Sequence, residues 1–155
     1  MSNELSVLVI DPVAEDARRL ELCLAQCVAF TVDFHHQPDP AVALRRLGRL
    51  HIDVLFIDDA MPAVTGCEVI RAARSAGEVR TIIATSGGEA CDYLAADLIR
   101  AGADAYLHKR DLSPGFVQTV LARARAAARQ RTTHVTLRKE ALRGLLGSPR
   151  TLALR

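Results

Sequence analysis

Short apolar runs recur along the chain at intervals that fit an alternation of strands and helices. Four of them, at 7–10, 54–57, 81–84 and 105–108, are too short to be helices. Most are rich in branched side chains and apolar on both faces, which is typical of buried parallel strands. A fifth run, 31–35, alternates apolar and polar residues instead. It is predicted to be an edge strand with one face in water.

Helical periodicity fills the segments between these runs. Apolar residues recur three and four positions apart in five segments: 13–28, 39–50, 66–76, 92–101 and 113–131. Two segments open with Asp39-Pro40 and Ser113-Pro114, an N-cap side chain followed by Pro at the first helical position. Gly102 is placed to end the fourth helix.

Strand and helix therefore alternate about five times, and this order predicts an α/β fold. Such alternation requires a parallel sheet with helices on both faces. An open, doubly wound sheet is favoured over a barrel, because eight strand–helix units do not fit in 155 residues. The length suits one domain.

A boundary is predicted at 131–133, dividing a domain (residues 1–131) from a C-terminal tail (residues 132–155). One helical face of the tail gathers apolar residues, namely Leu137, Ala141, Leu142, Leu145 and Leu146. Gly147-Ser148-Pro149 would end this helix, and residues 151–155 alternate as a short strand would. An apolar stripe of this length either packs on its own domain or meets a partner. We expect a homodimer.

The composition is that of an ordinary globular protein. Half of the residues are hydrophobic and a quarter are charged, and the net charge is only +2, so the chain as a whole does not attract nucleic acid strongly. No apolar stretch approaches the roughly 20 residues of a membrane helix, and the start of the chain lacks a signal-peptide pattern. The four cysteines show neither metal-ligand nor disulfide spacing. We expect a cytoplasmic protein.

Chemically reactive side chains follow four of the predicted strands. Asp11 comes after the first run, Asp58 after the third, Thr85 after the fourth and Lys109 after the fifth. In an open parallel sheet, ligands bind beyond the carboxyl ends of the strands, so these groups are expected to converge. Paired carboxylates attract Mg²⁺. A carboxylate can also accept a phosphoryl group, whose oxygens then need a cation, a lysine and a hydroxyl around them.

Other enzyme classes fit the sequence less well. No Gly-x-x-x-x-Gly-Lys is present, which excludes a nucleotide-binding P-loop, and no Gly-x-Gly-x-x-Gly follows the first strand, which argues against a dinucleotide site. A phosphatase of the haloacid dehalogenase type needs a second acid two residues after its nucleophile, which neither Asp11 nor Asp58 has. With 4% aromatic residues, the walls of a flavin site are also lacking.

The segment after the third strand resembles a known family. Residues 58–66 read Asp-Asp-Ala-Met-Pro-Ala-Val-Thr-Gly, with Met-Pro three and four residues after the first Asp and Gly eight after it. This pattern resembles the receiver domain of bacterial two-component response regulators. Supporting pieces are Asp11, Thr85-Ser86, the run 101–106 and Lys109, and the resemblance covers roughly residues 6–131. It implies a flavodoxin-like (βα)5 fold whose five parallel strands lie in the order 2-1-3-4-5.

The same resemblance implies roles for individual residues. Asp58 would be the phosphoacceptor. Asp11, Asp58 and the backbone carbonyl of Ala60 would hold Mg²⁺. Thr85 and Lys109 would bind the phosphoryl group. Tyr106 would be the aromatic switch that turns inward when Thr85 moves.

Three positions depart from the family pattern. Pro12 stands where a second acid is usual, so Mg²⁺ should bind more weakly than at a three-acid site. Glu15 or Asp16 could reach back to replace that acid, although both equally suit the helix N-terminus. Arg110 stands where Pro commonly follows the lysine, so no cis peptide bond is expected there. Ala60 carries only a methyl group where many members have a longer polar side chain, which leaves the lifetime of a phosphorylated state open.

The resemblance implies a phosphorylation-dependent signalling switch rather than an enzyme, apart from slow autodephosphorylation. Its phosphoryl donor would be a sensor histidine kinase or a histidine phosphotransfer protein, and its output a downstream protein target. Direct DNA binding and membrane contact are not expected. The alternative is a degenerate receiver that binds proteins without phosphorylation. Pro12 and Arg110 motivate this alternative, whereas Asp58, Thr85 and Lys109 oppose it.

Overall fold

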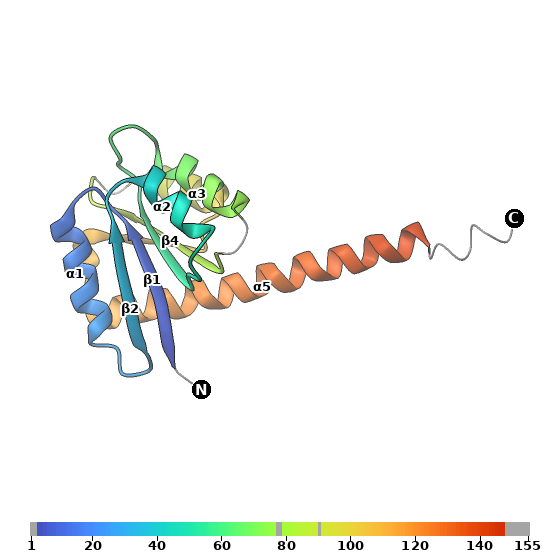
Figure 1. Cartoon of the computed structure of the whole chain (residues 1–155), viewed down its shortest axis with the longest axis horizontal. Coiled ribbons are helices and arrows are strands. Elements are labelled where there is room, and N and C mark those ends of the chain that lie inside the picture. Colours follow the sequence, from blue (N-terminus) through green and yellow to red (C-terminus); the bar gives the residue numbers. More distant parts are fainter. Residues whose placement is uncertain (1–2, 77–78, 90, 148–155) are drawn as a thin grey trace, which may run out of the picture.

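A computed structural model describes residues 3–76, 79–89 and 91–147. Its elements are β1 (Glu4–Ile10), α1 (Ala14–Ala25), β2 (Thr31–Gln37), α2 (Pro40–Leu47), β3 (Val54–Asp58), α3 (Gly66–Ser75), β4 (Thr81–Ser86), α4 (Asp92–Ala101), β5 (Ala105–His108), a 3₁₀ turn (Lys109–Asp111) and α5 (Pro114–Leu146) (Figure 1). The strands pair in parallel in the order β2-β1-β3-β4-β5. This is the flavodoxin-like α/β fold, and it confirms both the predicted alternation and the predicted strand order.

The alternation of side chains along the central strands builds a core on each face of the sheet. Val7 and Val9 of β1 pack in a cluster with residues of α1 and α5. Leu8 and Ile10 pack in a second cluster with residues of α2, α3 and α4. Runs that are apolar on both faces therefore lie between two layers of helices, while β2 occupies an edge as predicted.

Local signals fix where helices begin and end. The Asp39 carboxylate accepts a hydrogen bond of 2.9 Å from the backbone N–H of Ala41, with Pro40 at the first position of α2. Ser113 caps α5 in the same way. Gly102 ends α4 at a φ of +127°, a conformation that favours glycine. These predicted caps are confirmed.

The last helix, which the sequence predicts to end near residue 131, continues without interruption to Leu146. The threonines that indicated a boundary are accommodated by bonding to the preceding turn. The hydroxyl groups of Thr132, Thr133 and Thr136 each donate to the carbonyl four residues earlier, at 3.0–3.1 Å. The apolar residues expected on a separate tail helix therefore belong to α5. The expected strand at 151–155 lies outside the described residues.

The final turns of α5 project away from the rest of the fold (Figure 1). No helix among the described residues combines the length and the apolar character needed to cross a membrane. The division into a domain of residues 1–131 and a tail stays a prediction.

A buried ion cluster holds α5 where the helix leaves the sheet. The Asp104 carboxylate accepts hydrogen bonds from Arg74 Nη2 at 2.7 Å and from the backbone N–H of Ile82 at 2.9 Å. It also pairs with Arg131 of α5, and Arg131 donates a further hydrogen bond of 2.8 Å to the carbonyl of Arg80. The Asp104 side chain is only 4% exposed. The cluster thereby joins α3, β4 and α5.

Candidate functional site

The strand register places the predicted site residues next to one another. Ile10 of β1 pairs with Ile57 of β3, so Asp11 and Asp58 follow on neighbouring strands. Asp58 itself pairs with Thr85 of β4. Lys109 comes directly after β5, and the last residue of β5, His108, pairs with Ser86, which follows Thr85. All four site side chains are buried, and they come together at the carboxyl edge of the sheet as expected.

Lys109 places one ammonium group among three carboxylates. Its Nζ lies 2.8 Å from Asp11 Oδ2, 2.9 Å from Asp58 Oδ1 and 2.8 Å from Asp16 Oδ2. The contact with Asp16 has the geometry of a directed hydrogen bond. Asp16 does therefore reach back to the site, as a partner of the lysine, because it lies in the first turn of α1.

The electrostatics of the site follow from burial and from these contacts. Burial raises the pKa of Asp58 above its ordinary value; the hydrogen bond and charge of Lys109 oppose this rise, and the neighbouring carboxylates of Asp11 and Asp59 add to it. Burial alone would lower the pKa of Lys109, but its three carboxylate partners outweigh burial and hold that pKa well above its usual range. Lys109 is thus a permanent cation in a site that has excess negative charge.

Backbone N–H groups hold the carboxylates of Asp58 and Asp11, the two candidate metal ligands, in place. Asp58 Oδ2 accepts a hydrogen bond of 3.2 Å from the backbone N–H of Ala60. Asp11 Oδ1 accepts one of 2.8 Å from the backbone N–H of Val13. Each residue thereby keeps its other carboxylate oxygen directed at Lys109. Fixed acceptors of this kind suit a group that must be preorganised for reaction.

Two glycines make room for the site. A Cβ atom at Gly66 would lie 2.8 Å from the Cα atom of Asp59 and 3.0 Å from the carbonyl oxygen of Asp58. Only glycine therefore lets α3 begin against the backbone of the site, which explains the glycine eight residues after Asp58. A Cβ atom at Gly87 would lie 3.2 Å from Cδ of Lys109, so this glycine leaves space for the lysine stem.

Tyr106 lies on β5 and pairs with Ala84, the residue before Thr85. Its side chain packs against the cluster that contains α3 and α4. Its phenol oxygen is buried and has no hydrogen-bond partner among the described residues. The tyrosine is therefore turned inward in this structure, and its role as a switch stays a prediction.

The oxygen donors at this edge fit Mg²⁺ in chemical type. Two carboxylates, of Asp11 and Asp58, and the carbonyl of Ala60 offer the hard oxygen ligands that Mg²⁺ prefers. Over the described residues, no group of three or more His, Cys, Asp or Glu side chains forms a ready metal cluster. Pro12 adds no side-chain donor, because its ring contains no oxygen; the residue lines an apolar groove instead.

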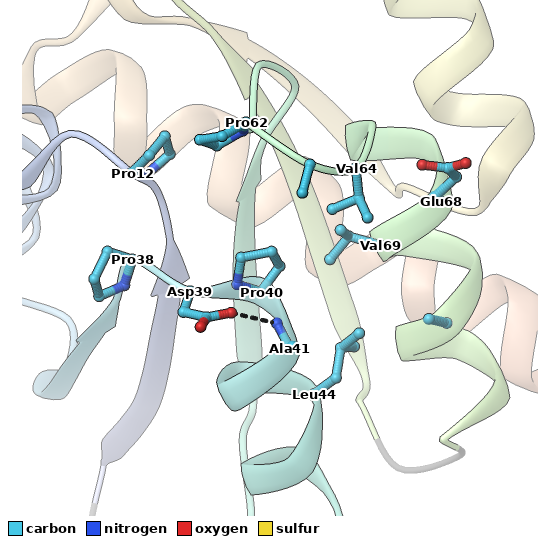
Figure 2. Close-up of a pocket in the computed structure, with 12 residues that line it drawn as sticks. Pro12, Pro38, Asp39, Pro40, Ala41, Leu44, Pro62, Val64, Glu68 and Val69 are labelled. Carbon is cyan, nitrogen blue, oxygen red and sulfur yellow. Dashed lines mark hydrogen bonds between the residues drawn. The ribbon is translucent and has the colours of Figure 1, made fainter.

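This groove, which we call the α2–α3 groove, lies beside the acidic site and has a volume of about 650 Å³. Figure 2 shows that its walls come from the connections after β1, β2 and β3 and from the first two turns of α2 and α3. The lining residues are Pro12, Pro38, Asp39, Pro40, Ala41, Leu44, Pro62, Ala63, Val64, Glu68, Val69 and Ala72. Sequence reasoning missed the groove. The signal that could have found it is the proline that follows each of these three strands.

Comparison with known proteins shows which family this chain is similar to. A profile of the response regulator receiver domain family matches residues 7–119. Response regulator MprA from Mycobacterium ulcerans (strain Agy99) is 33% identical over 121 residues, which cover 76% of this chain and 49% of that protein. The chain thus spans about half the length of this curated relative.

Solved structures agree on the fold. The chemotaxis response regulator CheY4 of Vibrio cholerae is 23% identical with a TM-score of 0.63, covering 78% of this chain and 98% of its own. The receiver domain of the histidine kinase CKI1 from Arabidopsis thaliana, solved in complex with Mg²⁺, is 26% identical with a TM-score of 0.58, covering 68% of this chain and 83% of its own.

Proposed function

This chain belongs to the response regulator receiver domain family, and from that premise we propose that it is a phosphorylation-dependent switch with Asp58 as phosphoacceptor. The observation that supports this role best is the contact between Asp58 and Lys109, 2.9 Å apart, at a buried edge shared with Asp11 and Thr85. A buried carboxylate beside a fixed cation is suited to attack phosphorus and then to have its product charge neutralised.

The proposed reaction is a transfer between two proteins. A carboxylate oxygen of Asp58 attacks the phosphorus of a phosphohistidine on a sensor kinase or phosphotransfer protein. An O–P bond forms, the N–P bond breaks, and the imidazole leaves with its electron pair. Lys109 and the hydroxyl of Thr85 bind the transferred oxygens.

Mg²⁺, held by Asp11, Asp58 and the carbonyl of Ala60, would supply positive charge to the phosphoryl oxygens when bound. The receiver domain of the histidine kinase CKI1 was solved in complex with Mg²⁺, which supports the same ion here. We propose that the output is contact with a downstream protein.

Asp58→Asn should abolish phosphorylation, because an amide oxygen cannot form the acyl phosphate. The measurement is transfer of labelled phosphate from acetyl phosphate and from histidine kinases in the presence of Mg²⁺, with release of the label by base. Asp59→Asn is the matched control, since it removes the same charge one residue away and should keep the label. Labelling that survives Asp58→Asn, or a wild type that no donor labels, would favour a binding module that works without phosphorylation.

Pro12→Asp should tighten Mg²⁺ binding about tenfold, because it adds a third carboxylate beside Asp11. The affinity can be measured by titrating both proteins with Mg²⁺ while following the amide NMR signals of Asp59 and Ala60. Pro38→Asp adds an acid elsewhere in the α2–α3 groove and should leave the affinity near that of the wild type. Equal affinities of Pro12→Asp and wild type would show that another acid already fills this place, with Asp16 the first to test.

A further inference from the structure

The part of α5 that leaves the domain exposes an apolar surface. We call residues 132–146 the α5 extension; it projects from the fold in Figure 1. Its large apolar side chains are far more exposed than those of a core helix, with Val135 at 48%, Leu142 at 51%, Leu145 at 83% and Leu146 at 81%. Apolar side chains gathered on one exposed segment mark a contact with another molecule.

The spacing of these side chains favours docking in a groove over pairing with a second helix. Leu142, Leu145 and Leu146 stand at i, i+3 and i+4, the anchor spacing of helices that lie in grooves. A coiled coil would need apolar residues at every a and d position. With Val135 and Leu142 at a, the d position between them is Arg138.

Charge points the same way. The α5 extension carries Arg138, Lys139 and Arg143 against a single acid, Glu140. Two copies of this segment placed side by side would bring like charges together, which is destabilising. The basic residues of the α5 extension would pair more favourably with a binding surface that has acidic residues at its edges.

The α2–α3 groove is such a surface. Leu44, Val64 and Val69 supply apolar side chains to it. The charged residues that line it, Asp39 and Glu68, are both acidic, and Figure 2 shows them on opposite sides of the groove. Its volume of about 650 Å³ lies in the range of pockets that hold several apolar groups. The prolines of its walls each have a fixed φ angle, which restricts the backbone around the groove and favours a preformed shape.

The α5 extension cannot fill the groove of its own chain. α5 packs on the face of the sheet that α1 also covers, whereas α2 and α3 cover the opposite face. The extension is part of one continuous helix of 33 residues and leads away from the domain. A second copy of the chain brings an identical helix without this restriction.

We propose that the α5 extension of one copy docks in the α2–α3 groove of a second copy. Leu142, Leu145 and Leu146 enter the groove, and the basic residues beside them lie near Asp39 and Glu68. The contact joins two different surfaces, so a reciprocal exchange gives a closed dimer, and a one-way contact gives longer assemblies. This inference stands apart from phosphorylation of Asp58.

Sedimentation of the full chain across the micromolar range tests the contact. Wild type should associate, and Leu145→Asp on the helix or Val64→Asp in the groove should each weaken association at least about tenfold, because a charge would be buried among apolar groups. Ile99→Asp is the matched control, since it places the same charge at an exposed apolar position of α4, outside the contact. Circular dichroism of each variant verifies that it is folded.

A mixing experiment separates this contact from helix–helix pairing. The Val64→Asp protein keeps an intact helix and the Leu145→Asp protein keeps an intact groove. Their mixture should associate more strongly than either variant alone. If Val64→Asp associates like wild type and the mixture shows no gain, the helices pair with each other and the proposal is wrong. A wild type that stays monomeric over the whole range would also overturn it.

Discussion

Replacing Lys109 with Met should both destabilise the fold and slow phosphoryl transfer. The change keeps much of the apolar stem but removes the charge that three carboxylates share at 2.8–2.9 Å. Leaving buried charges without their partner costs about 3 kcal/mol of unfolding free energy at neutral pH. Loss of a cation at the phosphoryl oxygens should slow transfer roughly 100-fold. Urea denaturation and the labelling assay measure the two effects.

The pH dependence of the stability loss identifies its cause. Without Lys109, burial raises the pKa of Asp58 in the folded state further above its unfolded value, because the opposing hydrogen bond and charge of the lysine are gone. The folded variant then binds more protons than the unfolded chain, so its stability is retained near pH 4 and is lost as pH rises through the raised pKa of Asp58. In the wild type, the raised pKa of Lys109 stabilises the fold throughout this window, because the group stays protonated well above neutral pH.

The deficit of Lys109→Met relative to wild type should therefore shrink in acid. Lys139→Met is the matched control, because Lys139 is the chain's other lysine and is exposed on α5. It should change neither stability nor transfer. An equal deficit at acid and neutral pH would attribute the loss to packing of the lysine stem instead of its charge.

Asp104→Asn should be the most destabilising change outside the acidic site. The Asp104 carboxylate is buried between Arg74 and Arg131 and also accepts from the backbone N–H of Ile82. The amide keeps the size of the side chain but leaves two guanidinium groups facing each other without an anion. We expect a loss of about 3 kcal/mol of unfolding free energy. Amide exchange in α5 near Arg131 should speed up as well, because this cluster holds the helix at its exit.

Asp97→Asn supplies the control for Asp104→Asn. Asp97 pairs with Arg100 at 3.4 Å on the surface of α4, where both side chains are well exposed. Exposed pairs contribute about 0.5 kcal/mol or less, so urea denaturation should barely distinguish this variant from wild type. A small effect of Asp104→Asn would mean that the bonds of Arg74 and Arg131 to backbone carbonyls suffice to hold the cluster.

Much of the fold was predictable because its signals are local. Branched apolar runs identified the strands, Asp39 and Ser113 identified helix starts, and Gly102 identified a helix end. The convergence of Asp11, Asp58, Thr85 and Lys109 was also predictable, since the carboxyl ends of parallel strands lie at one edge of a sheet. These inferences need only the order of elements along the chain.

Other features were decided by contacts between segments far apart in sequence. Asp16 reaches Lys109 across 93 positions, and Arg131 is anchored by Asp104 and by the carbonyl of Arg80. Periodicity tells which face of a helix is apolar, but not which distant side chain meets a polar residue on that helix. The sequence therefore left Asp16 undecided between the site and the helix N-terminus.

The α5 extension and the α2–α3 groove show the same limit. The sequence contains the leucines of the extension, yet its threonines indicated a boundary before them. In the structure, these threonines stay helical because their hydroxyl groups donate hydrogen bonds to carbonyls of the preceding turn. The groove arises because three connections, each with a proline, meet between α2 and α3. Sequence by itself determined the elements, their order and the residues at the strand ends, because those depend on nearest neighbours. Which surfaces stay uncovered was decided only in the tertiary structure, because exposure depends on how all the elements pack together.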